Sequence, residues 1–405
     1  RLNMFEDCIL LKEIRLNEID TRSVINMSRM FSKCAYLTKL DLKNFNTENV
    51  EDMSYMFEYC SSLTSLDLSS FNTIKTKDMS YMFYHNNKLN NLDISNFNTE
   101  NVINMAYLFS NMNFLTSLDL SNINTKNVKY MSHLFESCES LKEIQISHFD
   151  TSSVVDMSSM FEECRTLTSI DLSNFNTGNV KNMSKIFSGC SNLRQINVEK
   201  FNTNEVLDMS YMFRYCTQLY SLNLNKFNTE KVESMKGMFQ SCQNLNIIDI
   251  SSFRTSNVKD MSNMFAQCQA IRQLDLSKFD TSEVTDMNTM FQNCKSLSNL
   301  VINSFITNNV RNMSQMFQSC FSLYNLDLSK FETNEVLNMS LMFAESQNLR
   351  QLDLRSFKTG KVKDMAYMFY RLYVITSLDL SGFDTTQVTD MYAMFKNCGS
   401  LKFLD

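Results

Sequence analysis

Residues 37–62 read LTKLDLKNFNTENVEDMSYMFEYCSS, and the pattern of this stretch returns every 26 residues along the chain. Counted from Leu11, it fills 15 complete copies over residues 11–400, without an insertion or deletion, flanked by partial copies at residues 1–10 and 401–405. A fixed period of this length is typical of a solenoid, in which each copy forms one coil stacked on the last. We therefore predict one continuous solenoid over residues 1–405. The positions of a copy are called columns 1–26 below, with Leu11 in column 1.

The apolar columns predict a strand followed by a short helix. Columns 4 and 6, such as Leu66 and Leu68, alternate with polar neighbours like the residues of a half-buried strand. Columns 17, 20, 21 and 24 have the spacing of one helix face and hold, in the second copy, Met53, Met56, Phe57 and Cys60. Asp or Asn prevails in column 16 and is expected to cap that helix. We predict an α/β repeat solenoid of 15 complete 26-residue coils, with a parallel sheet on one face and short helices on the other.

Thr fills column 11 in all 15 copies, from Thr21 to Thr385. We expect its hydroxyl to bond backbone groups where the chain turns out of the strand. Whether columns 11 to 14 form a second short strand stays open at this point.

The composition excludes several classes of protein. Proline is absent, which fits a backbone that is hydrogen-bonded from coil to coil. No apolar run approaches 18 residues, so no membrane span is expected. A net charge of −6 carries no basic footprint, so we expect no nucleic-acid partner.

The phrases IDLSNFNTGNVKNMSKIFSGCSNL (residues 170–193) and LDLSSFNTIKTKDMSYMFYHNNKL (residues 66–89) closely resemble the BspA-like leucine-rich repeats of bacterial and protist surface proteins. The resemblance covers essentially the whole chain. It implies a leucine-rich-repeat arc that is secreted or displayed on a cell and binds other proteins or host surfaces. It does not identify the ligand.

Cysteine, methionine and phenylalanine follow the core columns. All 12 cysteines lie in column 24, which Asn86, Met112, Ser346 and Leu372 fill in other copies. A metal or redox site would not tolerate that exchange, so we predict buried free thiols. The 29 methionines and 32 phenylalanines are also explained mainly as core.

No constellation of catalytic residues stands apart from the repeat, so the chain is not expected to be an enzyme. Its three histidines, His85, His133 and His148, fall in different columns and have no partner at catalytic or metal-ligand spacing. We predict no cofactor and no metal centre; binding of Ca²⁺ by a row of aspartates is the less favoured of two interpretations described next.

Aspartate recurs on the exposed side of the strand, in column 5, in four successive copies: Asp41, Asp67, Asp93 and Asp119. Parallel strands lie about 4.8 Å apart, so neighbouring carboxylates repel one another and would attract Ca²⁺ or a basic partner. The alternative is that each Asp bonds local amides or is simply solvated. We favour this alternative.

Tyrosine avoids the apolar columns, unlike phenylalanine. It clusters near the start of the chain and near its end, at Tyr55, Tyr59, Tyr81, Tyr84 and Tyr107 and at Tyr367, Tyr370, Tyr373 and Tyr392. A large ring with a polar tip suits contact with a protein or a sugar. The alternative is that the rings only cover the core.

These observations favour a non-catalytic recognition or adhesion array, secreted or on the cell surface, that binds a protein or glycan ligand on a cell or matrix surface. The alternative is a structural spacer, or a scaffold that assembles end to end.

Overall fold

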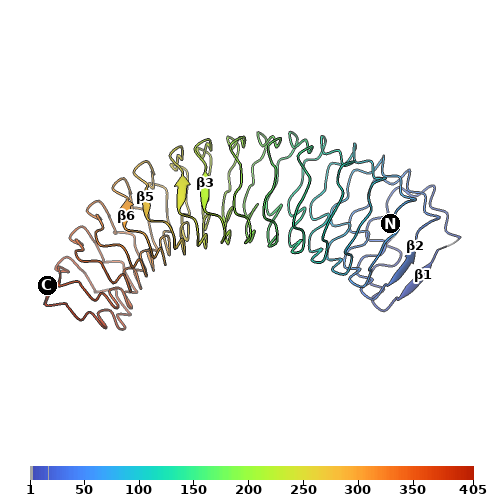
Figure 1. Ribbon diagram of the computed structural model, residues 1–405. Helices are drawn as coiled ribbons and strands as arrows, with labels where there is room; N and C mark the ends of the chain where they lie inside the picture. Colours follow the sequence, from blue (N-terminus) through green and yellow to red (C-terminus); the bar gives the residue numbers. More distant parts are fainter. Residues whose placement is uncertain (1–2, 17) are drawn as a thin grey trace. The chain divides into compact units, whose positions relative to one another are not determined.

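The computed structural model describes residues 3–16 and 18–405 and divides into two compact units, Arg1–Glu205 and Val206–Asp405. In each unit the chain winds into coils that stack side by side (Figure 1). Parallel bridges at column 16 join successive coils, from Asn26 to Asn182 in the first unit and from Asp208 to Asp390 in the second. A repeat solenoid therefore describes each unit.

Strands occupy columns 3 to 5 in some coils only. They are β1 Glu13–Arg15, β2 Lys39–Asp41, β3 Ser221–Asn223, β4 Ile247–Asp249, β5 Gln273–Asp275, β6 Asn299–Val301, β7 Ser377–Leu378 and β8 Phe403–Leu404. They form four two-stranded parallel sheets, in which each residue pairs with the residue one repeat further on, as Ile14 does with Leu40.

The continuous sheet predicted from the sequence is thus reduced, over the described residues, to four separate pairs. Columns 3 and 5 lie on the exposed side of the coil, as in β3, where Ser221 and Asn223 are exposed and Leu222 is buried. Exposed amides can bond water instead of a neighbouring strand, so a missing ladder on this side has a small energetic cost.

The predicted short helices are wrong: the described part of the chain contains none. Columns 17 to 24 form consecutive four-residue turns instead. In the second copy, the amides of Met56, Glu58 and Cys60 each bond the carbonyl three residues back, at 3.1–3.3 Å. The amides between them, such as those of Tyr55 and Phe57, bond the next coil at 2.8 and 3.0 Å.

The amides of columns 17 to 24 bond alternately within their own coil and to the next coil, and this explains why the helix prediction failed. A helix needs every amide to bond the carbonyl four residues back, whereas here every second amide is committed to the neighbouring coil. The turns nevertheless bury the same four columns, because Met53, Met56, Phe57 and Cys60 are all fully buried. The spacing of buried residues therefore cannot distinguish a short helix from these consecutive turns.

Each turn segment places two residues in the left-handed region, in columns 19 and 23, with φ near 58° at Tyr55 and 55° at Tyr59. A positive φ at the third position is the requirement of a type II turn. Glycine fills these columns only at Gly189 and Gly237. At Gly237 an added Cβ would lie 2.5 Å from the ring of Tyr211, so this glycine also makes room for a neighbour.

The expected role of threonine in column 11 is confirmed. The hydroxyl of Thr21 donates to the carbonyl of Asn46 at 2.8 Å and accepts the amide of the same residue at 2.7 Å. The predicted cap residues of column 16 act as turn acceptors, since the Asp52 carboxylate accepts the amide of Ser54 at 2.9 Å.

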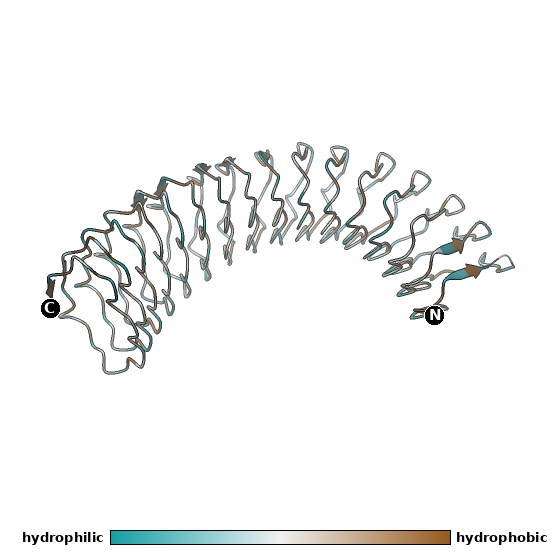
Figure 2. Cartoon of the chain, turned by 60° about the horizontal axis from the view of Figure 1, so that its bottom comes forward, coloured by the Kyte–Doolittle hydropathy of each residue, from teal (hydrophilic) through white to brown (hydrophobic). Residues whose placement is uncertain are grey.

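The core is a set of ladders that run through each unit, and polar and apolar residues alternate along every coil (Figure 2). Phenylalanine rings of column 21 stack on one another, as Phe31 does on Phe57 with centroids 5.8 Å apart. The cysteines are free thiols, as predicted, and all are buried except Cys8, which is exposed, and Cys398, which is half-buried.

Candidate functional site

The turn side of the first unit carries a stack of rings, called the tyrosine stack below: Tyr55, Tyr81 and Tyr107. They lie in column 19 of successive coils, with centroids 4.5 and 4.2 Å apart and nearly parallel planes. Arg29 covers the outer face of Tyr55 at 4.0 Å, and His133 stacks on Tyr107 at 4.0 Å. Each ring face in the stack is therefore covered by a neighbouring side chain, and only the ring edges and hydroxyl groups can contact a ligand.

Two further predicted tyrosines support this stack from the side. Tyr84 meets Tyr81 edge to face at 5.4 Å and Tyr59 at 5.3 Å. His85 lies against Tyr59 at 4.6 Å. All of these rings are half-buried. Burial raises the pKa of Tyr81, with further contributions from its neighbour Tyr107. The structure thus brings together the five tyrosines that the sequence grouped here.

The second predicted group, in columns 18 to 25 near the end of the chain, is looser. Tyr367 meets Tyr370 and Tyr392 edge to face at 5.3 and 5.2 Å. Arg371 lies over Tyr370 at 4.9 Å. Tyr373 is 41% exposed.

Each predicted aspartate of column 5 accepts the amide two residues further on. The distances are 3.1 Å at Asp41 and Asp67, 3.0 Å at Asp93 and 2.9 Å at Asp119. These bonds hold the pKa of Asp93 below its usual value, against the charges of Asp67 and Asp119. A local turn explains why Asp recurs here. Binding of Ca²⁺ by these aspartates, the less favoured alternative, is not tested by these bonds.

Open clefts separate successive coils on the strand side, the side that carries columns 2 to 8. One cleft of about 580 Å³ has Asp93 and Asp119 in its lining, and another of about 770 Å³ has Asp353 and Asp379. Neither lies at a joint where the strands are paired. Clefts are not confined to unpaired joints, because another of about 500 Å³ is lined by residues of the paired strands β1 and β2.

A row of side chains that the sequence analysis did not single out borders such a cleft in the second unit. We call it the Tyr–Arg row: Tyr220, Arg272, Tyr324 and Arg350, all in column 2. Tyr220 is 54% exposed and Tyr324 is 57% exposed, and both arginines are exposed. Tyr220 and Arg272 line a cleft of about 480 Å³.

Sequence reasoning had one signal for this row. Column 2 varies along the chain: it holds Tyr or Arg at the four positions of the row, and Thr, Asn, Ser or Lys in most other copies, for example Thr38 and Ser298. Variation in one column against a fixed background marks a position that the core does not constrain.

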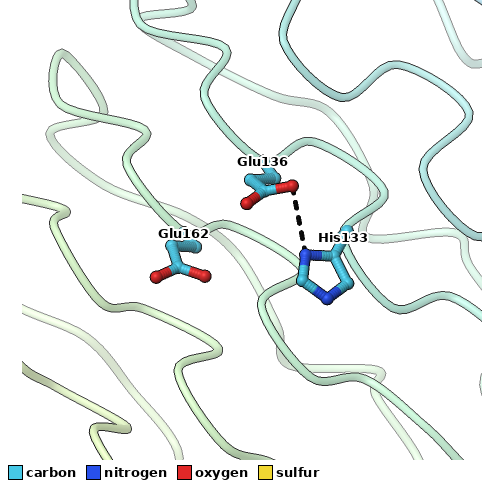
Figure 3. A group of neighbouring side chains, drawn as sticks. All are labelled: His133, Glu136 and Glu162. Carbon is cyan, nitrogen blue, oxygen red and sulfur yellow. Dashed lines mark ion pairs between the residues drawn. The ribbon is translucent and has the colours of Figure 1, made fainter. Parts of the chain in front are cut away.

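His133 has acidic neighbours that its place in the repeat does not indicate. Its Nδ1 atom lies 3.1 Å from a carboxylate oxygen of Glu136, and Glu162 of the next coil faces the same space (Figure 3). One ligand atom from each of these three residues lies within 4.8 Å of the other two. The structure thus assembles from two coils a group that no spacing within one repeat predicts.

The chain matches one protein family along nearly its whole length. The family is described as "Mycoplasma protein of unknown function, DUF285", and its model matches residues 2–119, 104–221, 213–322 and 298–403. No curated protein matches the chain. Over the described residues no helix is long and apolar enough to cross a membrane.

Several solved structures are distantly similar. A leucine-rich repeat protein from Bacteroides ovatus is 14% identical with a TM-score of 0.49, over 99% of this chain and 86% of that one. A leucine-rich cell surface protein from Faecalibacterium prausnitzii is 13% identical with a TM-score of 0.28, over 99% and 74%. A leucine-rich repeat protein from Eubacterium ventriosum is 14% identical with a TM-score of 0.27, over 69% and 82%. These likenesses are too distant to carry over a ligand or an activity.

Proposed function

The chain belongs to the DUF285 family, and from that premise we propose that it is a non-catalytic repeat array that binds another protein through the strand side of its coils. The Tyr–Arg row carries this proposal. Tyrosine and arginine are the side chains that most often dominate the binding energy of protein interfaces. Here they are exposed in one column of the repeat, so a partner that lies along the strand side could contact several of them at once.

The two sides of the coil have different roles in this proposal. On the turn side, backbone amides of one coil bond carbonyls of the next, as described for the second copy. The rings of the tyrosine stack also cover one another there. That side holds the array together. On the strand side, clefts between the coils give concave surface beside exposed rings. A partner needs such surface to bury its own side chains.

The tyrosines and aspartates predicted from the sequence enter the proposal as secondary contacts. Tyr81 and Tyr107 lie on the turn side and would present hydroxyl edges only to a part of the partner that extends beyond the strand side, and Tyr373 would present a ring face. Asp93 and Asp119 would meet basic groups of a partner at the mouth of their cleft. Secretion or display at the cell surface, and adhesion as the biological role, are proposed from the resemblance to BspA-like repeats.

A photo-crosslinking amino acid at position 220 or 324 tests the binding surface. A matched position in the first unit is 36, since Tyr36 is 54% exposed and lies outside the row. We expect positions 220 and 324, but not 36, to crosslink one protein on intact cells or their matrix. Equal crosslinking from all three positions would remove the support for this surface.

The captured protein is then purified and its affinity measured. The change Tyr220→Ser with Tyr324→Ser is expected to weaken binding by about 30-fold or more, since loss of each anchor ring costs at least about 1 kcal/mol. Tyr36→Ser is expected to leave the affinity unchanged.

Protease treatment of intact source cells tests the proposed location. Release of peptides from residues 1–405, while a cytosolic marker stays inside, is the expected result. Protection until lysis would favour an internal scaffold. A pure structural spacer, the alternative function, would give no specific partner from either tyrosine of the row.

A further inference from the structure

The group formed by His133, Glu136 and Glu162 combines one imidazole and two carboxylates at a joint between two coils. Glu136 belongs to the same coil as His133, and Glu162 occupies the same column of the next coil. The three side chains are mostly buried, with exposed fractions of 21%, 22% and 13%. Their ligand atoms lie within 4.8 Å of one another.

The Nδ1 atom of His133 is the least satisfied atom of this group. It is buried and has no hydrogen bond of acceptable geometry, although the Glu136 carboxylate is only 3.1 Å away. An ion placed between the three residues would be shared by this nitrogen and by both carboxylates.

Neighbouring residues hold the ligands in place. Tyr107 stacks on the imidazole at 4.0 Å, and Ser110 donates to Glu136 at 3.0 Å. Lys185 lies 3.5 Å from one oxygen of Glu162, which leaves the second oxygen for another partner. Such outer contacts orient metal ligands and commonly alter affinity when removed.

We propose that His133, Glu136 and Glu162 bind one divalent transition-metal ion, and we choose Zn²⁺ as the probe. Zn²⁺ takes imidazole nitrogen and carboxylate oxygen at about 2.0–2.2 Å, so the side chains close in by a rotamer adjustment when it binds. Three protein ligands leave a fourth position for water. The ion would join two successive coils and so stabilise their stacking.

The alternative reading is an ordinary ion pair between His133 and Glu136, with Glu162 paired to Lys185. It needs no metal and predicts no saturable binding. A titration with metal therefore distinguishes the two interpretations, because only the proposed site gives saturable binding.

The experiment is isothermal titration of Zn²⁺ into the tag-free chain at neutral pH. Cys8 is exposed and Cys398 is half-buried, so both are changed to Ser in the background to remove competing thiols. We expect one equivalent to bind, and His133→Asn or Glu162→Gln to weaken binding at least tenfold. No saturable binding in the background protein would overturn the proposal.

The matched control is His85→Asn, because His85 is another half-buried histidine in contact with a tyrosine ring. It is expected to leave binding intact; an equal loss here would overturn the assignment. Ser110→Ala is expected to weaken binding by about tenfold through the orientation of Glu136.

Two further readouts keep the result independent of folding defects. Each variant is melted without metal, and only a variant that keeps its transition is compared. Zn²⁺ should raise the melting temperature of the background protein and not that of His133→Asn. Co²⁺ in the same site should show no thiolate charge-transfer band; such a band would place the metal on cysteine and overturn the proposal.

Discussion

The threonine hydroxyls of column 11 show how a single residue connects the coils. Thr281 is fully buried, donates to the carbonyl of Ile306 at 2.7 Å and accepts the amide of Ile306 at 2.8 Å. One side chain thus satisfies a donor and an acceptor of the next coil. The sequence could predict this role because only a hydroxyl on a short side chain explains a polar residue that never changes.

Thr281→Val tests this connection, because valine keeps the shape and removes both hydrogen bonds. We expect the free energy of unfolding to fall by about 2 kcal/mol, since two partly buried backbone groups lose their partner. Thr285→Val in the same coil is the control: Thr285 is exposed and makes one long bond, 3.2 Å, to Lys259. Urea denaturation should show a small effect for the control, and equal effects would contradict the role of column 11.

Histidine 133 shows what single-residue reasoning misses. Its acidic neighbours lie three residues away in its own coil and in the following coil, and the contact depends on the turns that replace the predicted helix. The same applies to the Tyr–Arg row, whose exposure follows from the coil geometry.

The turn segment of columns 17 to 24 is the element that sets the stacking. Its left-handed residues in columns 19 and 23 direct every second amide to the next coil. Most of these residues are not glycine, so a local conformational cost is accepted at nearly every turn. Stacked side chains such as those of Tyr55, Tyr81 and Tyr107 offset part of that cost.

Tyr81→Ala tests the stabilising role of the tyrosine stack. Tyr81 has a ring on each face, and each stacked pair contributes about 0.5–1.5 kcal/mol beyond area burial. We expect the free energy of unfolding to fall by about 1–3 kcal/mol. Tyr36→Ala, at a ring 54% exposed, should change it by less than about 0.5 kcal/mol. A stable Tyr81→Ala variant would show that the stack is not structural.

The repeat and its buried columns could be predicted from the sequence, whereas the type of element could not. Met53, Met56, Phe57 and Cys60 are buried as expected, but in turns. The choice between helix and turn depends on hydrogen bonds between coils, which the pattern of one coil does not contain. The number of complete coils and the continuity of residues 1–405 stay predictions.

At the scale of the whole chain, buried thiols link stability to pH. Burial raises the pKa of Cys34 to about 11 and that of Cys242 to about 12, from an ordinary value of 9.0. Below pH 9 these thiols are protonated in both states. Above it the unfolded chain loses their protons while the folded chain keeps them, so stability falls as the pH rises through the range 9 to 12.

We therefore expect the free energy of unfolding, measured by urea denaturation, to fall between about pH 9 and pH 10.5, by up to about 1.4 kcal/mol per pH unit for each such thiol. Cys242→Ser with Cys320→Ser should reduce the slope. Serine is accepted in this column, since Ser346 donates to the carbonyl of Phe317 at 2.6 Å. An unchanged slope in the variant would rule out the thiols as its source.

Hydrogen–deuterium exchange resolved to single amides tests most directly whether the turn side holds the array and leaves the strand side open. We predict slow exchange in columns 17, 19, 21 and 23, for example at Tyr55 and Phe57. Fast exchange is predicted in columns 3 to 5 outside the four strand pairs, for example at Leu92 and Asp93. The opposite pattern, with protected strands and rapidly exchanging turns, would make a continuous sheet the frame of the molecule.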